Sequence, residues 1–293
     1  MQNPKLVVVA PGFFAPSGGP EALHQLVYMA NIVQPGSAAI LYEPAETIES
    51  SIAPYRKYNC PTILEQDIPH DALIVLPEIW PELSSRFKNK CALWWLSVGF
   101  FGSHGHSDIS GIDIHLTQSF YAKEHLKTIG INNSQMLTDW IDLVPVLDFV
   151  KENLIAVNPA KGIDLINSFS KNNPDLNIIK IQGMNKQEVT TAMSKSKIYI
   201  DFGHHPGRDR MPREASLLNA VVFVKRTGAA SYKEDVPIDE YFKFDDISEL
   251  REKIIYTLDN YEAQKDIQEE YKSWCLNNYK EFMKETSSLL SGI

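Results

Sequence analysis

Short apolar runs alternate with amphipathic segments along the first half of the chain. Near-continuous apolar runs, which are typical of strands buried on both faces of a parallel sheet, lie at residues 5–10, 38–42, 73–76 and 92–98, and residues 115–117 are predicted as a further short strand. After Pro20, the apolar residues Leu23, Leu26 and Ala30 recur at helical spacing. A second amphipathic segment, residues 119–128, ends before Gly130. We therefore predict a doubly wound α/β domain.

The second half repeats the alternation after a mixed stretch, residues 139–152, that Pro145 interrupts. We predict strands at residues 154–157, 177–182, 197–202, 221–224 and 241–244. We predict helices at residues 161–171, 186–195, 212–219, 247–258 and 261–290. The expected organisation is an N-terminal domain over 1–148, a C-terminal domain over 149–260, and a long terminal segment over 261–293.

Length and composition support this organisation. A chain of 293 residues is long enough for two α/β domains with separate cores. Its formal net charge of −9 disfavours nonspecific binding to nucleic acid, which needs a basic face. No apolar run is long enough to span a bilayer, and the N-terminal run is too short for a signal peptide, so we expect a cytoplasmic protein.

The three cysteines, Cys60, Cys91 and Cys275, are isolated in the sequence. Their spacing indicates neither a disulfide framework nor a zinc site. A pair of histidines, His204 and His205, also lacks a third ligand at a convincing spacing, so we expect no metal.

The segment with the most candidate binding residues is residues 201–215, between a predicted strand and a predicted helix. It contains Arg208, Arg210, Arg213 and Glu214. Phosphates bind where a loop at the carboxyl end of a parallel strand leads into a helix. Guanidinium groups are planar, permanently charged donors, and a glutamate accepts hydrogen bonds from sugar hydroxyls. The segment therefore predicts a site for a phosphorylated ligand, although surface salt bridging is an alternative role for the arginines.

Four segments together resemble the GT-B fold glycosyltransferases, in the retaining, group 1-like set that uses nucleotide-sugar donors. They are residues 155–162 with 165–166, residues 182–183 with 188–189, residues 199–203 with 212–215, and residues 18–21 with Leu26. The resemblance implies two Rossmann-like βαβ domains that face a central cleft, with a C-terminal helix that crosses back to the N-domain. It also implies that cationic side chains and helix N-termini, rather than a metal or other cofactor, neutralise the donor diphosphate.

The donor-binding residues that this resemblance implies lie mostly in the second half. They are Gly18, Gly19, Asn158, Lys161, Gly183, Met184, His205, Arg208, Arg213, Glu214, Thr227 and Gly228. We expect Lys161 and Arg208 to stabilise the charge that develops on the leaving diphosphate. For Lys161, the alternative is an ordinary solvated lysine at a helix start.

The sequence departs from the family at two positions. The family has paired glutamates with seven residues between them, and counting back from Glu214 reaches Pro206. In the family, the second glutamate holds ribose hydroxyls and the first lies beside the donor sugar. Asn219 also replaces the glycine that usually follows. His204 and His205 are candidates to replace the absent carboxylate, with polar surface residues as the alternative.

Candidates for the acceptor side lie in the first half, where the strand that contains Trp94 and Trp95 leads into a glycine-rich loop. We predict that His104 or His106 assists the acceptor hydroxyl; a loop without a catalytic role is the alternative. Glu78, at another strand end, is a further candidate. The tryptophans are better explained as core and cleft lining than as a sugar-stacking surface.

The resulting hypothesis is a glycosyltransferase that moves a sugar from a nucleotide-diphosphate donor to a hydroxyl of a sugar or lipid-linked acceptor, in bacterial surface polysaccharide or glycoconjugate synthesis. A lipid-linked acceptor implies peripheral contact with the inner face of the membrane, where residues 86–90 are the basic cluster of the N-domain. The alternative is a non-catalytic nucleotide-sugar-binding or partner subunit. A nicotinamide-dependent oxidoreductase is disfavoured, because no Gly-x-Gly-x-x-Gly follows the first strand.

Overall fold

The computed structural model describes residues 3–103, 105, 107–142 and 149–293. The chain divides into two compact units, one formed by Met1–Trp140 with Asn278–Ile293 and the other by Ile141–Asn277. The boundary that we predicted after residue 148 adjoins residues 143–148, which lie outside the described residues.

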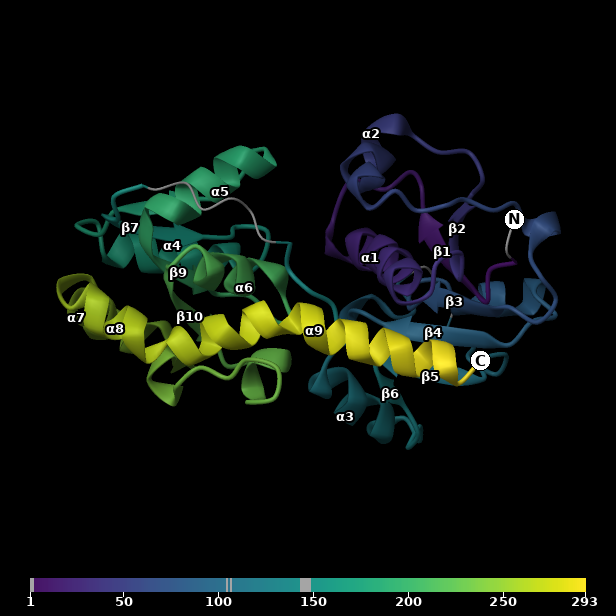
Figure 1. The fold of residues 1–293 in the computed structure, drawn as a ribbon. Coiled ribbons are helices and arrows are strands. Elements are labelled where there is room, and N and C mark those ends of the chain that lie inside the picture. The colour runs from purple at the N-terminus through teal and green to yellow at the C-terminus, as the bar shows by residue number, and fades with distance from the viewer. Residues whose placement is uncertain (1–2, 104, 106, 143–148) are drawn as a thin grey trace. The chain divides into compact units, whose positions relative to one another are not determined.

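The first unit is built on a parallel sheet that contains six strands among its described residues, in the order β2-β1-β3-β4-β5-β6 (Figure 1). The strands are β1 (Leu6–Pro11), β2 (Ala38–Glu43), β3 (Leu73–Pro77), β4 (Cys91–Trp95), β5 (Ile114–Thr117) and β6 (Gln135–Met136). Its helices are α1 (Gly18–Val33), α2 (Glu49–Ile52) and α3 (Phe120–Thr128). Side chains from both faces of the central strands are buried, in two clusters, which explains their continuous apolar sequence.

The second unit contains a parallel sheet of five described strands in the order β11-β10-β9-β7-β8 (Figure 1). The strands are β7 (Glu152–Val157), β8 (Ile178–Lys180), β9 (Ser196–Asp201), β10 (Val221–Lys225) and β11 (Lys243–Phe244). The helices are α4 (Ile163–Asn172), α5 (Lys186–Lys195), α6 (Arg210–Leu217), α7 (Leu250–Asp259), α8 (Tyr261–Ile267) and α9 (Glu269–Ser291). Since the strands are parallel, their carboxyl ends meet at one edge of the sheet.

One buried lysine ties several elements of the second unit together. The Lys151 ammonium donates to the carbonyl oxygens of Ser196 and Leu218, both at 2.7 Å, and of Met193 at 3.3 Å. These carbonyls lie at the ends of α5 and α6 and at the start of β9. Burial lowers the pKa of Lys151 to about 7. The three carbonyl contacts act in the opposite direction, because they favour the charged ammonium.

The terminal helix α9 passes from the second unit to the first, as the fold prediction requires (yellow in Figure 1). Within the first unit, the Phe282 ring stacks on Trp94 and lies 5.2 Å from the Trp140 ring, measured between centroids. Glu285 accepts hydrogen bonds from the Thr138 backbone N–H and hydroxyl, at 2.7 and 2.8 Å. The C-terminal residues therefore complete the core of the N-terminal sheet.

Candidate functional site

The candidate site is the carboxyl edge of the second sheet, where the loops after β7, β9 and β10 meet. The loop after β9, residues 202–209, contacts both of the others. The Thr227 hydroxyl, after β10, donates to the Gly203 carbonyl at 3.1 Å. Lys161, after β7, reaches the same loop through an ion pair with Asp209. Most of the second-half residues that we predicted for donor binding lie in these loops or in the helix that follows.

Two aspartates and one histidine form the centre of the β9 loop. Asp201 is the last residue of β9, and its carboxylate accepts hydrogen bonds from the Tyr199 hydroxyl and the Gly203 backbone N–H, both at 3.0 Å. The His205 side chain is fully buried; its Nε2 lies 3.7 Å from Asp201 Oδ1 and its Nδ1 lies 3.2 Å from Asp209 Oδ2. This burial excludes the alternative that His205 is a polar surface residue. Asp201 and Asp209 also bring the number of potential metal-ligating side chains around His205 to three, whereas we expected no third ligand.

Lys161 lies beside this cluster. Its ammonium is 2.6 Å from Asp209 Oδ2, and about a third of its side chain (32%) is exposed. Burial raises the pKa of Asp209, while His205 and Lys161 act in the opposite direction by attraction. Lys161 is therefore a partly exposed cation in an otherwise enclosed group of charges.

Two glycines permit this approach of the loops. Gly162 has φ of +72°, and a Cβ there would lie 2.8 Å from the Phe202 carbonyl oxygen. A Cβ at Gly203 would lie 2.3 Å from the Cβ of Lys161. Both positions therefore need glycine, for backbone conformation at 162 and for close packing at both.

Arg208 and Arg213 hold the loop from within. Arg208 is buried; its Nε donates to Asp235 at 3.0 Å, and its guanidinium lies over the Trp274 ring, 5.1 Å from the centroid. Arg213 is also buried and donates to the Arg208 carbonyl at 2.7 Å and, more weakly, to the Asp209 carbonyl at 3.3 Å. These contacts give both arginines a structural role within the loop, and their contact with a diphosphate stays a prediction.

Arg210 and Glu214 lie on α6, one helical turn apart, with 4.0 Å between Arg210 Nε and Glu214 Oε1. The helix begins at Arg210, two residues before the predicted start. Glu214 keeps about a quarter of its side chain exposed, so its carboxylate is accessible to a ligand hydroxyl.

The remaining predicted residues have varied surroundings. Asn158 accepts a hydrogen bond from the Ala160 N–H at 3.0 Å, which shapes the turn before Lys161. Gly183, after β8, is exposed with φ of +66°, and Met184 packs against the core. At Gly228, a Cβ would lie 2.0 Å from the His205 carbonyl oxygen, so this glycine is explained by close packing between the loops after β9 and β10.

The predicted residues of the first half belong to the first unit. Gly18 and Gly19 open α1. Trp94 and Trp95 are fully buried in β4, in agreement with a core role. Glu78 is also buried, and burial raises the pKa of its carboxyl to about 8. His104 and His106 lie outside the described residues.

Sequence reasoning missed Asp201 and Asp209. Their signal was present, because Asp201, His205 and Asp209 recur at every fourth position, beginning at the last residue of a strand. We read that segment as a cationic loop, so its two carboxylates were not weighed. The fold brings both carboxylates within 4 Å of one imidazole.

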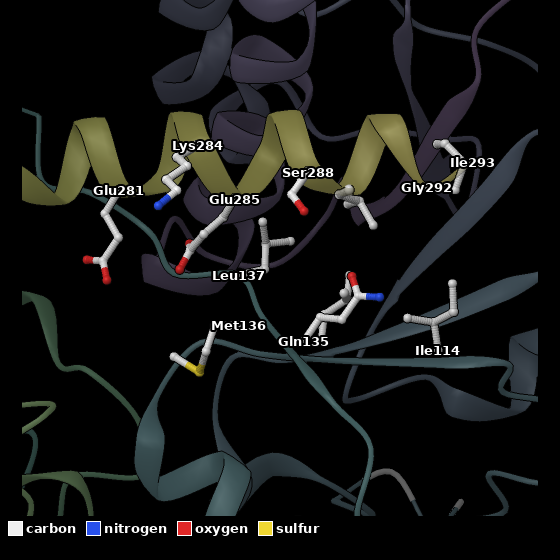
Figure 2. Close-up of a pocket in the computed structure, with 12 residues that line it drawn as sticks. Ile114, Gln135, Met136, Leu137, Glu281, Lys284, Glu285, Ser288, Gly292 and Ile293 are labelled. Atoms are coloured by element: carbon white, nitrogen blue, oxygen red, sulfur yellow. The ribbon is translucent and has the colours of Figure 1, made fainter.

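A cavity of about 570 Å³ lies elsewhere, in the first unit, between the β5–β6 edge and the end of α9 (Figure 2). Apolar residues such as Ile114 and Leu137 line it together with Glu281, Lys284 and Glu285. None of the predicted donor-binding residues lines it, so we place the site by its charged groups rather than by this cavity. Among the described residues, no helix is long and apolar enough to cross a membrane.

Comparisons with known proteins rest on the fold. The chain matches no family model, and no curated protein matches its sequence. Among solved structures, it is similar to HepE from Anabaena, solved with UDP-glucose, at a TM-score of 0.69 and 10% identity over 98% of this chain and 100% of that one. A glycosyltransferase from Rickettsia africae has a TM-score of 0.65 at 13% identity, with 98% of both chains covered.

The match to the Staphylococcus aureus protein TarM, in a complex that contains UDP, has a TM-score of 0.62 at 12% identity, over 77% of this chain and 57% of TarM. This chain thus spans little more than half of TarM. The two parallel α/β units, the terminal helix that returns to the first unit, and these structural matches agree with one another. The chain has the GT-B fold, as the resemblance of its sequence motifs predicted.

Proposed function

We propose that the protein is a glycosyltransferase that moves a sugar from a nucleoside-diphosphate donor to a hydroxyl acceptor. The observation that carries the proposal is the position of Lys161. It is a partly exposed ammonium at a glycine turn, on the carboxyl edge of the second sheet of a GT-B fold. HepE and TarM, which share the fold, were solved with UDP-glucose and with UDP.

Departure of a nucleoside diphosphate from the sugar develops negative charge on the leaving oxygen. A cation that contacts this charge more strongly in the transition state than in the ground state lowers the barrier. We propose this role for Lys161, whose ammonium exchanges its contact with Asp209 for the diphosphate. The N-terminus of α4, which begins directly after Gly162, adds the positive end of a helix dipole.

Glu214 and Arg210 are proposed to complete donor binding on α6. The Glu214 carboxylate accepts from ribose hydroxyls, and Arg210 holds that carboxylate by attraction. Transfer with retention of configuration, and a place in bacterial surface polysaccharide synthesis with a sugar or lipid-linked acceptor, are proposed from the family resemblance alone.

The second candidate is a non-catalytic subunit that binds the nucleotide sugar. Pro206 favours it, because it stands where the family has the glutamate beside the donor sugar. The two candidates agree on donor binding and differ only in turnover.

The test begins with a thermal-shift screen of UDP, GDP, ADP and CMP sugars, since a ligand that binds the native state raises its stability. With the donor that binds, we expect slow hydrolysis or transfer, and Lys161→Ala should lower kcat/KM about 100-fold, the typical loss for one transition-state charge contact. Lys171→Ala, at an exposed lysine on α4, is the control and should retain the wild-type rate.

Donor binding without hydrolysis or transfer to any acceptor in a lysate would favour the non-catalytic subunit. Equal rates for Lys161→Ala and the wild type would contradict the role of Lys161. If NADH binds and none of the nucleotide sugars does, both candidates are wrong.

A further inference from the structure

Three side chains with metal-ligating atoms converge in the loop after β9. Asp201, His205 and Asp209 each offer one ligand atom, and the three atoms lie within 4.8 Å of one another. Metal–ligand bonds of about 2.1 Å place any two ligand atoms no more than about 4.2 Å apart. In a tetrahedral site two ligand atoms lie about 3.4 Å apart, so the widest pair needs to close by up to about 1.4 Å, through rotation of the carboxylate side chains.

The His205 ring is the second, independent observation. It is fully buried, and neither ring nitrogen has a hydrogen-bond partner among the described residues. A protonated imidazole between two carboxylates would donate to both at about 2.7–2.9 Å. The observed separations, 3.2 Å to Asp209 and 3.7 Å to Asp201, are longer. The two carboxylates therefore leave both ring nitrogens without a hydrogen bond.

The charges around the ring also favour a cation. Asp201 and Asp209 contribute two negative charges, and Lys161 contributes one positive charge. Two carboxylates and one ammonium leave one net negative charge beside the ring in a largely buried environment, which is costly without compensation. The Asp201 carboxylate is fixed by the Tyr199 hydroxyl and the Gly203 N–H, as ligating carboxylates usually are.

We propose that Asp201, His205 and Asp209 bind a divalent metal ion. Two carboxylate oxygens and one imidazole nitrogen suit Mn²⁺ or Zn²⁺, because carboxylates are typical ligands of Mn²⁺ and imidazole is typical of Zn²⁺. The ion reaches the site from the side of Asp209, whose side chain is 18% exposed. The proposal replaces our expectation of a metal-free site, and it does not depend on sugar transfer.

Lys161 competes with the ion for one oxygen. Its ammonium contacts Asp209 Oδ2, the same atom that lies nearest His205 Nδ1. A bound ion displaces the ammonium from that oxygen and leaves it available to another anion. Removal of the ammonium should therefore strengthen metal binding, which is opposite in sign to the effect of removing a ligand.

The test is titration of the full-length protein, stripped with EDTA and desalted, with MnCl₂ and with ZnCl₂. We expect one site per chain by isothermal titration calorimetry, with Mn²⁺ binding confirmed by electron paramagnetic resonance. Asp209→Asn and His205→Gln should each weaken binding at least about tenfold. Lys161→Met should tighten it, and Asp164→Asn, at an exposed aspartate on α4, should leave it unchanged.

Circular dichroism establishes that each variant is folded; Asp209→Asn decides the test if the buried His205→Gln does not fold. The proposal is overturned if neither ion binds up to about 1 mM, the weak limit of protein cation sites. It is also overturned if folded Asp209→Asn binds as tightly as the wild type. Because no nucleotide is present, these results are independent of the proposed transfer reaction.

Discussion

The position of the Lys161 side chain depends on the absence of one atom, a Cβ at residue 203. A Cβ at Gly203 would lie 2.3 Å from the Lys161 Cβ, a distance that side-chain carbon atoms do not tolerate. The lysine is thus directed by a residue on a different loop, 42 positions along the chain. The spacing of residues along the sequence does not predict this contact.

Gly203→Ala should therefore displace Lys161 and destabilise the second unit by about 1–3 kcal/mol, the usual cost of overpacking. Thermal unfolding measures the loss of stability, and donor affinity measures the displacement. Gly292→Ala is the matched control, because a Cβ there lies 3.6 Å from the nearest atom, the Leu289 carbonyl oxygen, which is an ordinary contact. If both variants have wild-type stability and affinity, the packing at Gly203 is not what positions Lys161.

The buried carboxyl of Glu78 predicts a pH dependence of stability. Burial raises its pKa from an ordinary 4.5 to about 8, although N–H groups of the strand ends, including Leu96 at 3.4 Å, act against the shift. The folded protein therefore keeps a proton that the unfolded chain releases at lower pH. Stability from this group is complete below about pH 4.5 and is lost as the pH rises through about 8.

Glu78→Gln should remove this dependence, because the amide has nearly the same shape and does not ionise. We expect the unfolding free energy of the wild type to fall by up to about 1.4 kcal/mol per pH unit across this interval relative to Glu78→Gln. Urea unfolding from about pH 5 to about pH 8 measures it. Glu46→Gln, at an exposed glutamate, should keep the wild-type slope. If the unfolding free energy of Glu78→Gln depends on pH as steeply as that of the wild type, another group causes the dependence.

At the scale of elements, apolar periodicity predicted almost every strand and helix of the two units. The predicted segments 154–157, 186–195 and 197–202 correspond to β7, α5 and β9. Buried parallel strands are apolar over their whole length, which makes them visible in sequence. The two-residue strand β6 was missed, because two residues contain no periodicity and their pairing with β5 is a tertiary contact.

The start of α6 shows the same limit. We placed it at Pro212, since proline favours the first turn of a helix, whereas the helix begins at Arg210. The two additional residues are supported by Arg213, which donates back to the carbonyls of Arg208 and Asp209. A side chain that folds back on its own helix start cannot be read from propensity.

At the scale of the molecule, the two units are expected to fold separately, because each encloses its own core. The first unit lacks part of its core without the end of α9, where Phe282, Leu289 and Leu290 are buried. Deletion of a buried side chain of this size costs about 2–5 kcal/mol. The last residues of the chain are therefore needed for the stability of the N-terminal unit.

We therefore expect a fragment of residues 141–277 to fold alone and residues 1–140 to fail without residues 278–293. Circular dichroism and the dispersion of amide resonances in NMR spectra distinguish the two results. Addition of residues 278–293 as a peptide should recover structure in the 1–140 fragment. A stably folded 1–140 fragment, or an unfolded 141–277 fragment, would contradict this division.

By itself, the sequence determined the fold class and the edge of the sheet where the candidate site lies. Buried parallel strands and glycine turns can be recognised from a few consecutive residues of the sequence. Only the tertiary structure decided which charged side chains meet. It pairs Arg208 with Asp235, directs Lys161 to Asp209, and places His205 beside two aspartates. These partners come from different loops or across a folded turn, and their energies depend on distance and burial, which spacing along a chain does not record.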